Sequence, residues 1–114
     1  MGDGHAELLP GTLDLIVLRV LSLEPMHGWG IGERIRLLSD DVFEVNQGSL
    51  YPALQRMRRK GWIRAEWRRS ENNRRARYYA LTTAGEARLG DARDEWRRTS
   101  GAVERILGAV PEGA

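Results

Sequence analysis

The chain has 114 residues, 41% of them hydrophobic, so it can bury one modest core and we expect a single domain. It contains no cysteine, which excludes disulfide bonds, thiolate zinc sites and a cysteine nucleophile, and which fits a reducing cytoplasm. The net charge is only +2, yet residues 55–79 carry +8, from ten basic and two acidic residues, while the rest of the chain carries −6.

The first helix is expected to begin after a break in the pattern at residues 10–12. Residues 1–9 are typical of a flexible tail, and Thr12 is a candidate N-cap. The apolar stretch that follows contains Asp14 and Arg19 and is too short to cross a bilayer; no signal peptide precedes it, so we expect no membrane partner. Apolar residues on more than one side predict a helix buried almost all round: Leu13, Leu15, Ile16, Val17, Leu18, Val20 and Leu21.

Residues 25–28 interrupt the helical pattern, and a second helix is predicted after them. His27 is expected to cap this helix or pack against it, and residues 40–41, both aspartate, to end it. Residues 42–45 alternate between apolar and polar and predict one short strand. The core-facing residues of the second helix are expected to be Ile31, Ile35 and Leu38.

The third helix is predicted to start at Asn46, a good N-cap, and to end at Gly61, a good C-cap. Pro52 cannot donate to the carbonyl of Gly48, so we expect it to bend the first turns unless the helix starts later. The apolar face of this helix is formed by Leu50, Leu54 and Met57.

Residues 62–67 and 77–81 have the composition of two strands, and the polar segment 68–76 between them predicts a hairpin with a long tip. Aromatic residues alternate along these strands. Since aromatic strand residues usually cover a core, we expect a structural role for Trp62, Trp67 and Tyr79.

The last helix is predicted over residues 83–110, with Thr83 and Glu86 as a capping box and residues 111–114 as a tail. Apolar residues recur along it at spacings of three and four. Such a stripe is best buried by another helix, often from a second subunit, so we predict a dimerisation helix. The stripe consists of Leu89, Ala92, Trp96, Thr99, Val103, Ile106 and Val110.

This order of elements predicts a mainly α fold with a small β-hairpin, namely a winged helix-turn-helix over residues 10–82 followed by the long helix. In that fold the third helix enters the major groove and the hairpin reaches the backbone or the minor groove. The basic window covers both, which favours double-stranded DNA as partner; a solvated charged face is the alternative. The arginines expected to approach phosphates are Arg56, Arg59, Arg74, Arg75 and Arg77.

The N-terminal end of the third helix holds the candidates for base edges or nearby phosphates, which are Gln47, Ser49 and Tyr51. Tyr51 could instead pack its ring under the hairpin. Its polar hydroxyl close to a helix N-terminus favours contact with a phosphate.

At these residues the chain resembles the PadR-like transcriptional regulators, whose third helix opens with Gly-Ser/Thr-Leu-Tyr-Pro. The motif here is Gly48-Ser49-Leu50-Tyr51-Pro52, which places Pro52 among the DNA-binding candidates. Trp29 stands where the family has tyrosine, and one C-terminal helix is typical of the short subgroup. The resemblance spans residues 9–107, with further matches at Leu9-Pro10-Gly11-Thr12-Leu13-Asp14, His27-Gly28-Trp29-Gly30-Ile31, Lys60-Gly61-Trp62-Ile63, Trp67, Arg77-Tyr78-Tyr79-Ala80-Leu81-Thr82 and Ala84-Gly85.

The resemblance implies a homodimeric repressor that binds an inverted-repeat operator and releases it when a small aromatic molecule binds. It also implies a flat apolar slot for that molecule at the dimer interface, between the first and last helices. Trp96 could stack on the ligand or simply pack in the dimer interface, and both interpretations stay open. The implied slot residues are Asp14, Leu15, Leu18, Leu89, Ala92, Arg93 and Trp96.

No enzyme, metal or cofactor is expected. The two histidines, His5 and His27, have no carboxylates near them at metal-ligand spacing, and the glycines at 28, 30 and 32 lie inside a helix rather than after a strand. Because a fold does not fix function, a winged-helix adaptor that docks proteins without binding DNA is the alternative, and a protein that mainly sequesters drugs is a third.

Overall fold

The computed structural model describes residues 8–113, so most of the tail expected over residues 1–9 lies outside the described residues. Within them the helices are α1 (Pro10–Leu23), α2 (Gly28–Leu38), α3 (Gln47–Arg59) and α4 (Thr83–Leu107). The strands are β1 (Met26–His27), β2 (Ile63–Arg69) and β3 (Arg75–Leu81), which form one antiparallel sheet in the order β1-β3-β2. None of the described helices is long and apolar enough to span a bilayer.

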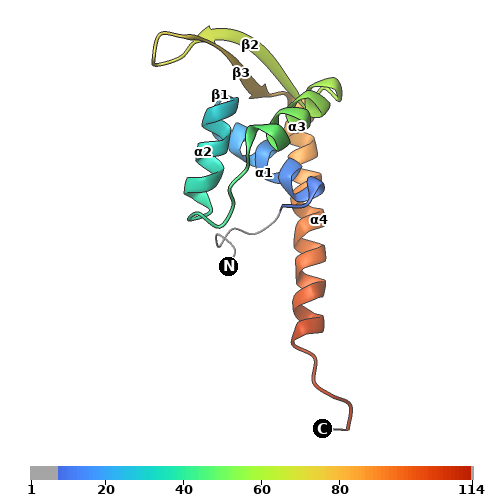
Figure 1. Cartoon of the computed structure of the whole chain (residues 1–114). Coiled ribbons are helices and arrows are strands. Elements are labelled where there is room, and N and C mark those ends of the chain that lie inside the picture. The colour runs from blue at the N-terminus through green and yellow to red at the C-terminus, as the bar shows by residue number, and fades with distance from the viewer. Residues whose placement is uncertain (1–7, 114) are drawn as a thin grey trace.

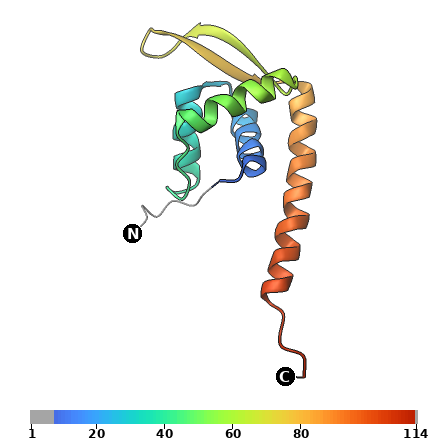
Figure 2. The same ribbon diagram turned by 45° about the vertical axis from the view of Figure 1, so that its right-hand side comes forward.

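The arrangement is that of a winged helix-turn-helix with a long C-terminal helix, as predicted. Helices α1, α2 and α3 form a compact bundle, and the β2–β3 hairpin projects over α2 and the beginning of α3 (Figure 1). From the base of this hairpin α4 runs down past α1 and continues beyond the bundle (Figure 2). The hairpin and α4 therefore leave the bundle from nearly the same place and in different directions.

The core lies around α1, whose predicted burial is confirmed for Leu13, Val17, Leu18, Val20 and Leu21, while Leu15 and Ile16 are half-buried. It also takes in the predicted apolar faces of α2 and α3. The exception is Leu38, which remains 62% exposed, so its assignment to the core is wrong. It stands in the last turn of α2, where the bundle no longer covers the helix. The other core residues from these helices are Ile31, Ile35, Leu50, Ala53, Leu54 and Met57.

The predicted N-caps of the first and last helices are wrong, although the last helix begins at Thr83 as predicted. Helix α1 begins at Pro10 with Leu9 as N-cap and no side-chain cap, because proline at the first helical position already has the helical φ. Thr12 therefore lies inside the first turn. Helix α4 is capped by Thr82 rather than Thr83: the Thr82 hydroxyl accepts from the Gly85 amide at 3.0 Å.

The strand predicted over residues 42–45 does not form. Asp40 and Asp41 have positive φ values of 55° and 65° and reverse the chain after α2, and the following segment has no strand to pair with. Its alternation reflects the half-buried Phe43 and Val45, which pack on the core from a loop. The short strand is instead Met26–His27, in which Met26 pairs with Tyr79 of β3.

The predicted caps of α3 are confirmed in outline. The Asn46 side chain accepts from the Ser49 amide at 2.8 Å, and Gly61, with φ of 80°, directly follows the capping residue Lys60. Helix α3 continues through Pro52 as one element. The N-terminal residues of α3 therefore belong to a helix that starts where the sequence predicted.

The hairpin is longer than predicted, and its tip shorter. Strands β2 and β3 extend to Arg69 and from Arg75, and the Ser70 amide donates to the Arg74 carbonyl at 2.7 Å to close the turn. Asn73, at φ of 58°, allows the tight reversal. The expected long tip over residues 68–76 is thus wrong, because polar residues continue the ladder on both strands.

The predicted end of the last helix also differs, since α4 stops at Leu107 and Val110 lies beyond it. At its other end the helix is pressed against the turn after α3. The Thr82 hydroxyl donates to the Gly61 carbonyl at 2.6 Å, and a Cβ on Gly85 would lie 2.0 Å from the Trp62 carbonyl oxygen. Only glycine allows this approach, which fixes where α4 starts relative to the winged domain.

Candidate nucleic-acid interface

The N-terminal end of α3 presents its predicted recognition residues on the surface. Gln47, Ser49 and Tyr51 are all exposed, and Tyr51 is 50% exposed, so half of its side chain is covered and half is open to solvent. Gln47 and Tyr51 are four residues apart and share a face of the helix. The Gln47 amide donates to the Gly28 carbonyl at 3.2 Å, which holds the start of α3 against the start of α2.

Strand β3 carries a row of side chains that leads from the core toward the tip of the wing. Arg75, Arg77 and Tyr79 alternate along the strand and therefore point to the same face. They line a common hollow with Gln47 and Tyr51 of α3, so this face of the wing and the recognition end of α3 lie together. Arg74, at the tip, borders the same hollow and is exposed.

Trp67 on β2 holds two of these arginines in place. It pairs directly with Arg77, and the guanidinium carbons of Arg75 and Arg77 lie 4.9 and 5.8 Å from the centre of its ring. Trp67 is 55% exposed, so its assignment to the core is wrong; Tyr79, by contrast, is buried, and Trp62 is half-buried against the core. Cation–π contacts of this kind restrict where the arginines point.

The acidic residues of the hairpin leave this row largely unneutralised. Glu66 lies on the opposite face, where Arg64 and Arg68 approach its carboxylate to 3.4 and 3.3 Å. Glu71 lies 3.8 Å from the His27 imidazole. The face shared with α3 therefore keeps its positive charge.

Arg56 differs from the other predicted phosphate-binding arginines because it is already paired. Its guanidinium donates to both carboxylate oxygens of Asp14, at 2.6 and 3.0 Å, and these hydrogen bonds raise the pKa of Arg56. The pair joins α3 to α1 inside the bundle. Arg59 and Pro52 on the same helix are exposed.

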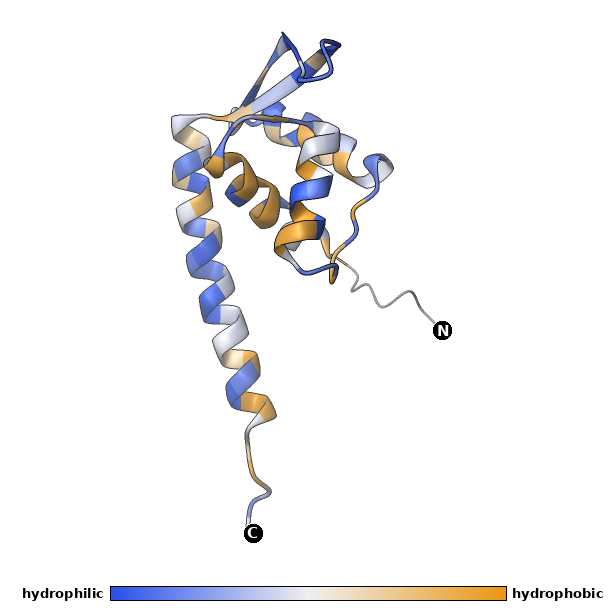
Figure 3. Cartoon of the chain, turned by 90° about the vertical axis from the view of Figure 1, so that its left-hand side faces the viewer, coloured by the Kyte–Doolittle hydropathy of each residue, from blue (hydrophilic) through white to orange (hydrophobic). Residues whose placement is uncertain are grey.

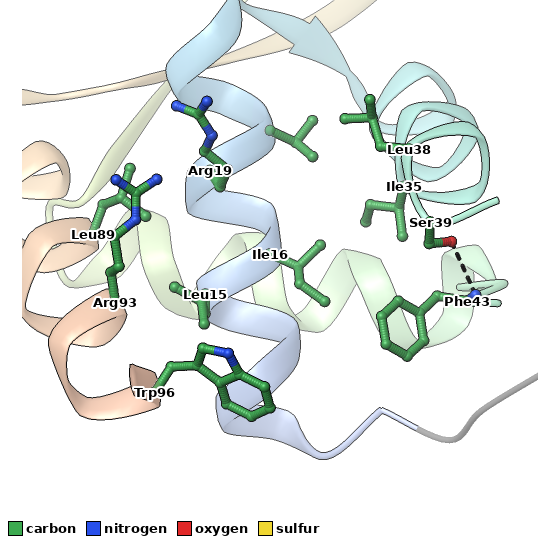
Figure 4. Close-up of a pocket in the computed structure, with 11 residues that line it drawn as sticks. Leu15, Ile16, Arg19, Ile35, Leu38, Ser39, Phe43, Leu89, Arg93 and Trp96 are labelled. Atoms are coloured by element: carbon green, nitrogen blue, oxygen red, sulfur yellow. Dashed lines mark hydrogen bonds between the residues drawn. The ribbon is translucent and has the colours of Figure 1, made fainter. Parts of the chain in front are cut away.

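A second region collects most of the predicted effector residues. Leu15, Leu89, Arg93 and Trp96 line a hollow of about 380 Å³ between α1, α4, the end of α2 and the segment that follows it (Figure 4). Ala92 borders a neighbouring hollow of about 370 Å³ that also includes Leu15 and Trp96.

Two predicted effector residues are not part of these hollows. Leu18 is fully buried in the core, and the Asp14 carboxylate is held by Arg56. Both lie on α1. This helix is covered on most of its sides, so its residues contact several different elements.

Several residues near the interface escaped the sequence-based prediction of function. Trp67 was expected in the core. Its position opposite Arg77 in a basic hairpin is the signal that could have identified it as a contact of the arginines. Trp29, 68% exposed at the start of α2, also borders the hollow shared by α3 and β3. His27 is the N-cap of α2, as expected, with its Nδ1 accepting from the Gly30 amide at 3.0 Å. Over residues 8–113 no group of three or more histidines and carboxylates is placed to hold a metal ion.

A winged domain with an exposed recognition helix and an arginine-bearing wing defines a winged-helix DNA-binding regulator. The model of the "Transcriptional regulator PadR-like family" matches residues 17–91, and the chain belongs to that family.

Relatives match nearly the whole chain. A PadR-like transcriptional regulator from Bacillus cereus has 25% identity and a TM-score of 0.79, covering 92% of this chain and 100% of its own. A PadR family regulator from Clostridium difficile has 26% identity and a TM-score of 0.73, covering 84% and 98%. An uncharacterised protein of Lysinibacillus sphaericus is 27% identical over 109 residues, 96% of either chain.

Proposed function

We propose that this regulator is a repressor that binds an inverted-repeat operator in duplex DNA as a homodimer. The observation that carries the proposal is the arginine row of β3, which lies beside the exposed recognition end of α3. A helix fits the major groove, so Gln47, Ser49 and Tyr51 would meet base edges and adjacent phosphates. The exposed arginines of the wing would bind the backbone without regard to sequence.

The remaining predicted contacts have unequal support. Arg59 and Pro52 are exposed on α3 and are kept in the proposed interface, Arg59 for phosphate contact. Arg56 is left out, because reaching DNA would break its two hydrogen bonds to Asp14. We propose binding rather than catalysis as the activity, and the cytoplasm, with its DNA, as the place of action.

The homodimer is proposed from the part of α4 beyond the bundle. Trp96, Val103 and Ile106 are 49%, 47% and 73% exposed and fall on one stripe of the helix. Hydropathy along α4 turns apolar again toward its C-terminal end (Figure 3). Exposed apolar stripes of this length indicate a protein interface, and a two-fold dimer would place two recognition helices on half-sites about one helical turn of DNA apart.

We also propose that a small planar aromatic molecule binds beside Trp96 and shifts the spacing of the two recognition helices. The support is the apolar hollow formed by Leu15, Leu89 and Trp96, with Arg93 available for an acidic group on the ligand. A hollow open to the stripe on α4 would be completed by the second subunit. Binding there would change the dimer geometry on which operator affinity depends.

Fluorescence titration with a panel of planar aromatic acids and dyes tests this effector site. Trp96→Ala should abolish ligand-dependent quenching while sedimentation still shows a dimer. Trp67→Phe removes a tryptophan of the wing instead and should leave the quenching intact. Titrations that are unchanged in Trp96→Ala would reject the site.

The function itself is tested by selecting duplexes from a random-sequence pool with the full chain. We expect enrichment of an inverted repeat, a footprint with two-fold symmetry, two chains per duplex and a steep loss of affinity with added salt. A reporter placed behind the selected site should be silenced when the protein is expressed. An adaptor that only docks proteins would enrich no sequence and show no salt-dependent DNA binding.

A further inference from the structure

A notch of about 390 Å³ lies where the starts of α2 and α3 meet one face of β3. We call it the wing notch. Trp29, Gln47 and Tyr51 line it from the helices, and Arg75, Arg77 and Tyr79 from the strand. Its lining, as far as the described residues define it, contains three arginines, Arg74, Arg75 and Arg77, and no carboxylate. This excess of positive charge makes it a place for an anion.

Two hydrogen-bond donors at the inner wall of the notch are buried without a partner in the described chain, the Tyr79 hydroxyl and the Nε of Arg77. Tyr79 as a whole is only 2% exposed. Buried polar groups are nearly always hydrogen-bonded, because an unsatisfied one costs free energy. Two unsatisfied donors in a single cationic notch indicate that a ligand completes the site.

Tyr51 connects these buried donors to the surface. Burial raises the pKa of Tyr79, and the nearby Tyr51 phenol raises it further while Arg77 opposes the shift, so the three groups lie within reach of one another. Tyr79 thus stays protonated and can donate. The Tyr79 hydroxyl interacts with the Tyr51 hydroxyl without reaching the geometry of a full hydrogen bond, and the Tyr51 side chain is half-exposed.

We propose that the wing notch seats one phosphate of the DNA backbone, with Tyr51 as its direct donor and Tyr79 as the residue that positions Tyr51. The inference rests on the proposed function. When DNA binds, the Tyr79 hydroxyl donates to the Tyr51 oxygen, and the Tyr51 hydroxyl donates to a phosphate oxygen. Each phenol can donate one hydrogen bond and accept another, and such a chain strengthens the bond at its charged end.

Arg77 supplies the charge of the seat. Trp67 holds its guanidinium near the notch, where its positive charge attracts the phosphate. The seat carries no sequence information, because every nucleotide has the same phosphate. Its effect is to fix how α3 lies in the groove, which makes Tyr79 a positioning residue for recognition although its hydroxyl is buried.

Tyr79→Phe tests the proposal, since it removes the hydroxyl and keeps the ring. We expect affinity to fall by about threefold to tenfold, equally for the selected duplex and for an unrelated one, with no decrease in the melting temperature. Tyr78→Phe is the matched control, because Tyr78 lies on the opposite face of β3, against His27, and should bind like the parent. Fluorescence anisotropy and thermal denaturation provide the two readouts.

A second pair of measurements tests the chain of contacts. In a Tyr51→Phe background, Tyr79→Phe should cause no further loss of affinity, because Tyr79 acts through Tyr51. Scanning the duplex with single neutral methylphosphonate groups should reveal one position per half-site where the parent loses affinity and the Tyr79→Phe variant loses much less.

The outcomes separate the two proposals. If the parent chain binds no duplex, the proposed function fails. If the parent binds and Tyr79→Phe binds equally well, loses affinity additively with Tyr51→Phe, or melts well below the parent, the function stands and the phosphate seat is overturned.

Discussion

The winged domain buries its apolar residues, whereas the distal part of α4 leaves its apolar residues exposed. In the domain, α1 is covered by α2, α3, β3 and the first turns of α4, and Val17 and Leu18 are fully buried by the chain's own residues. Along α4 the cover stops after Ala92, and Trp96 and Ile106 are 49% and 73% exposed. The domain therefore buries its apolar residues within one chain, whereas the exposed residues of the distal helix are the support for the proposed dimer.

This difference separates folding from assembly. Gly85 and the Thr82 cap fix α4 to the turn after α3, so the helix leaves the domain at a set angle. A helix of 25 residues gains most of its stability from packing, and beyond Ala92 the described chain offers little to pack against. Changes at the junction should unfold the domain, and changes in the distal stripe should affect assembly.

The largest effect is expected at the junction. Gly85→Ala places a methyl group 2.0 Å from the Trp62 carbonyl oxygen, and the backbone must move to relieve the overlap. We expect a loss of about 3 kcal/mol in the free energy of unfolding, measured by urea denaturation. Gly90→Ala on the same helix meets nothing within 4 Å and should be neutral or stabilising. Equal stability of the two variants would contradict the described junction.

The next effect is expected in the distal stripe. Ile106→Glu puts a charge into the proposed interface and should weaken the dimer by about 2 kcal/mol, about thirtyfold, while leaving the fold of the domain intact. Arg105→Gln changes the charge by the same amount on the other side of the helix and serves as the control. Sedimentation equilibrium measures both, and a dimer that is unaffected by Ile106→Glu would place the interface elsewhere.

A smaller effect is expected inside the bundle. Asp14→Asn weakens the paired hydrogen bonds to Arg56 and should lower the free energy of unfolding by about 1 kcal/mol, because the pair is only partly exposed. The dimerisation constant should not change. A denaturation midpoint equal to that of the parent chain would show that the pair does not stabilise the domain.

Local signals in the sequence predicted the helices and part of their capping. The Asn46 cap, the role of His27 and the core faces of α1 and α3 follow from side chains that act within one or two turns. The errors come from tertiary pairing. β1 exists because Met26 meets Tyr79, whereas residues 42–45 have the composition of a strand but no partner.

The candidate site was predictable in outline only. Exposed α3 residues and wing arginines follow from position in a winged helix, but the contact between Arg56 and Asp14 joins residues 42 positions apart and leaves no pattern in sequence. Trp67 and Tyr79 both follow the alternation of a strand. Only the structure separates the exposed Trp67, which holds arginines, from the buried Tyr79, whose hydroxyl lacks a partner.

The salt dependence of DNA affinity tests the central claim, that the wing and α3 bind duplex DNA as a dimer. The parent chain should show a steep negative slope of log affinity against log salt concentration on the selected duplex. Arg75→Gln removes one phosphate contact from each wing, so the slope should become shallower by about 1.8, whereas Arg105→Gln on α4 should leave it unchanged. A flat slope for the parent, or the same slope in Arg75→Gln, would contradict the claim.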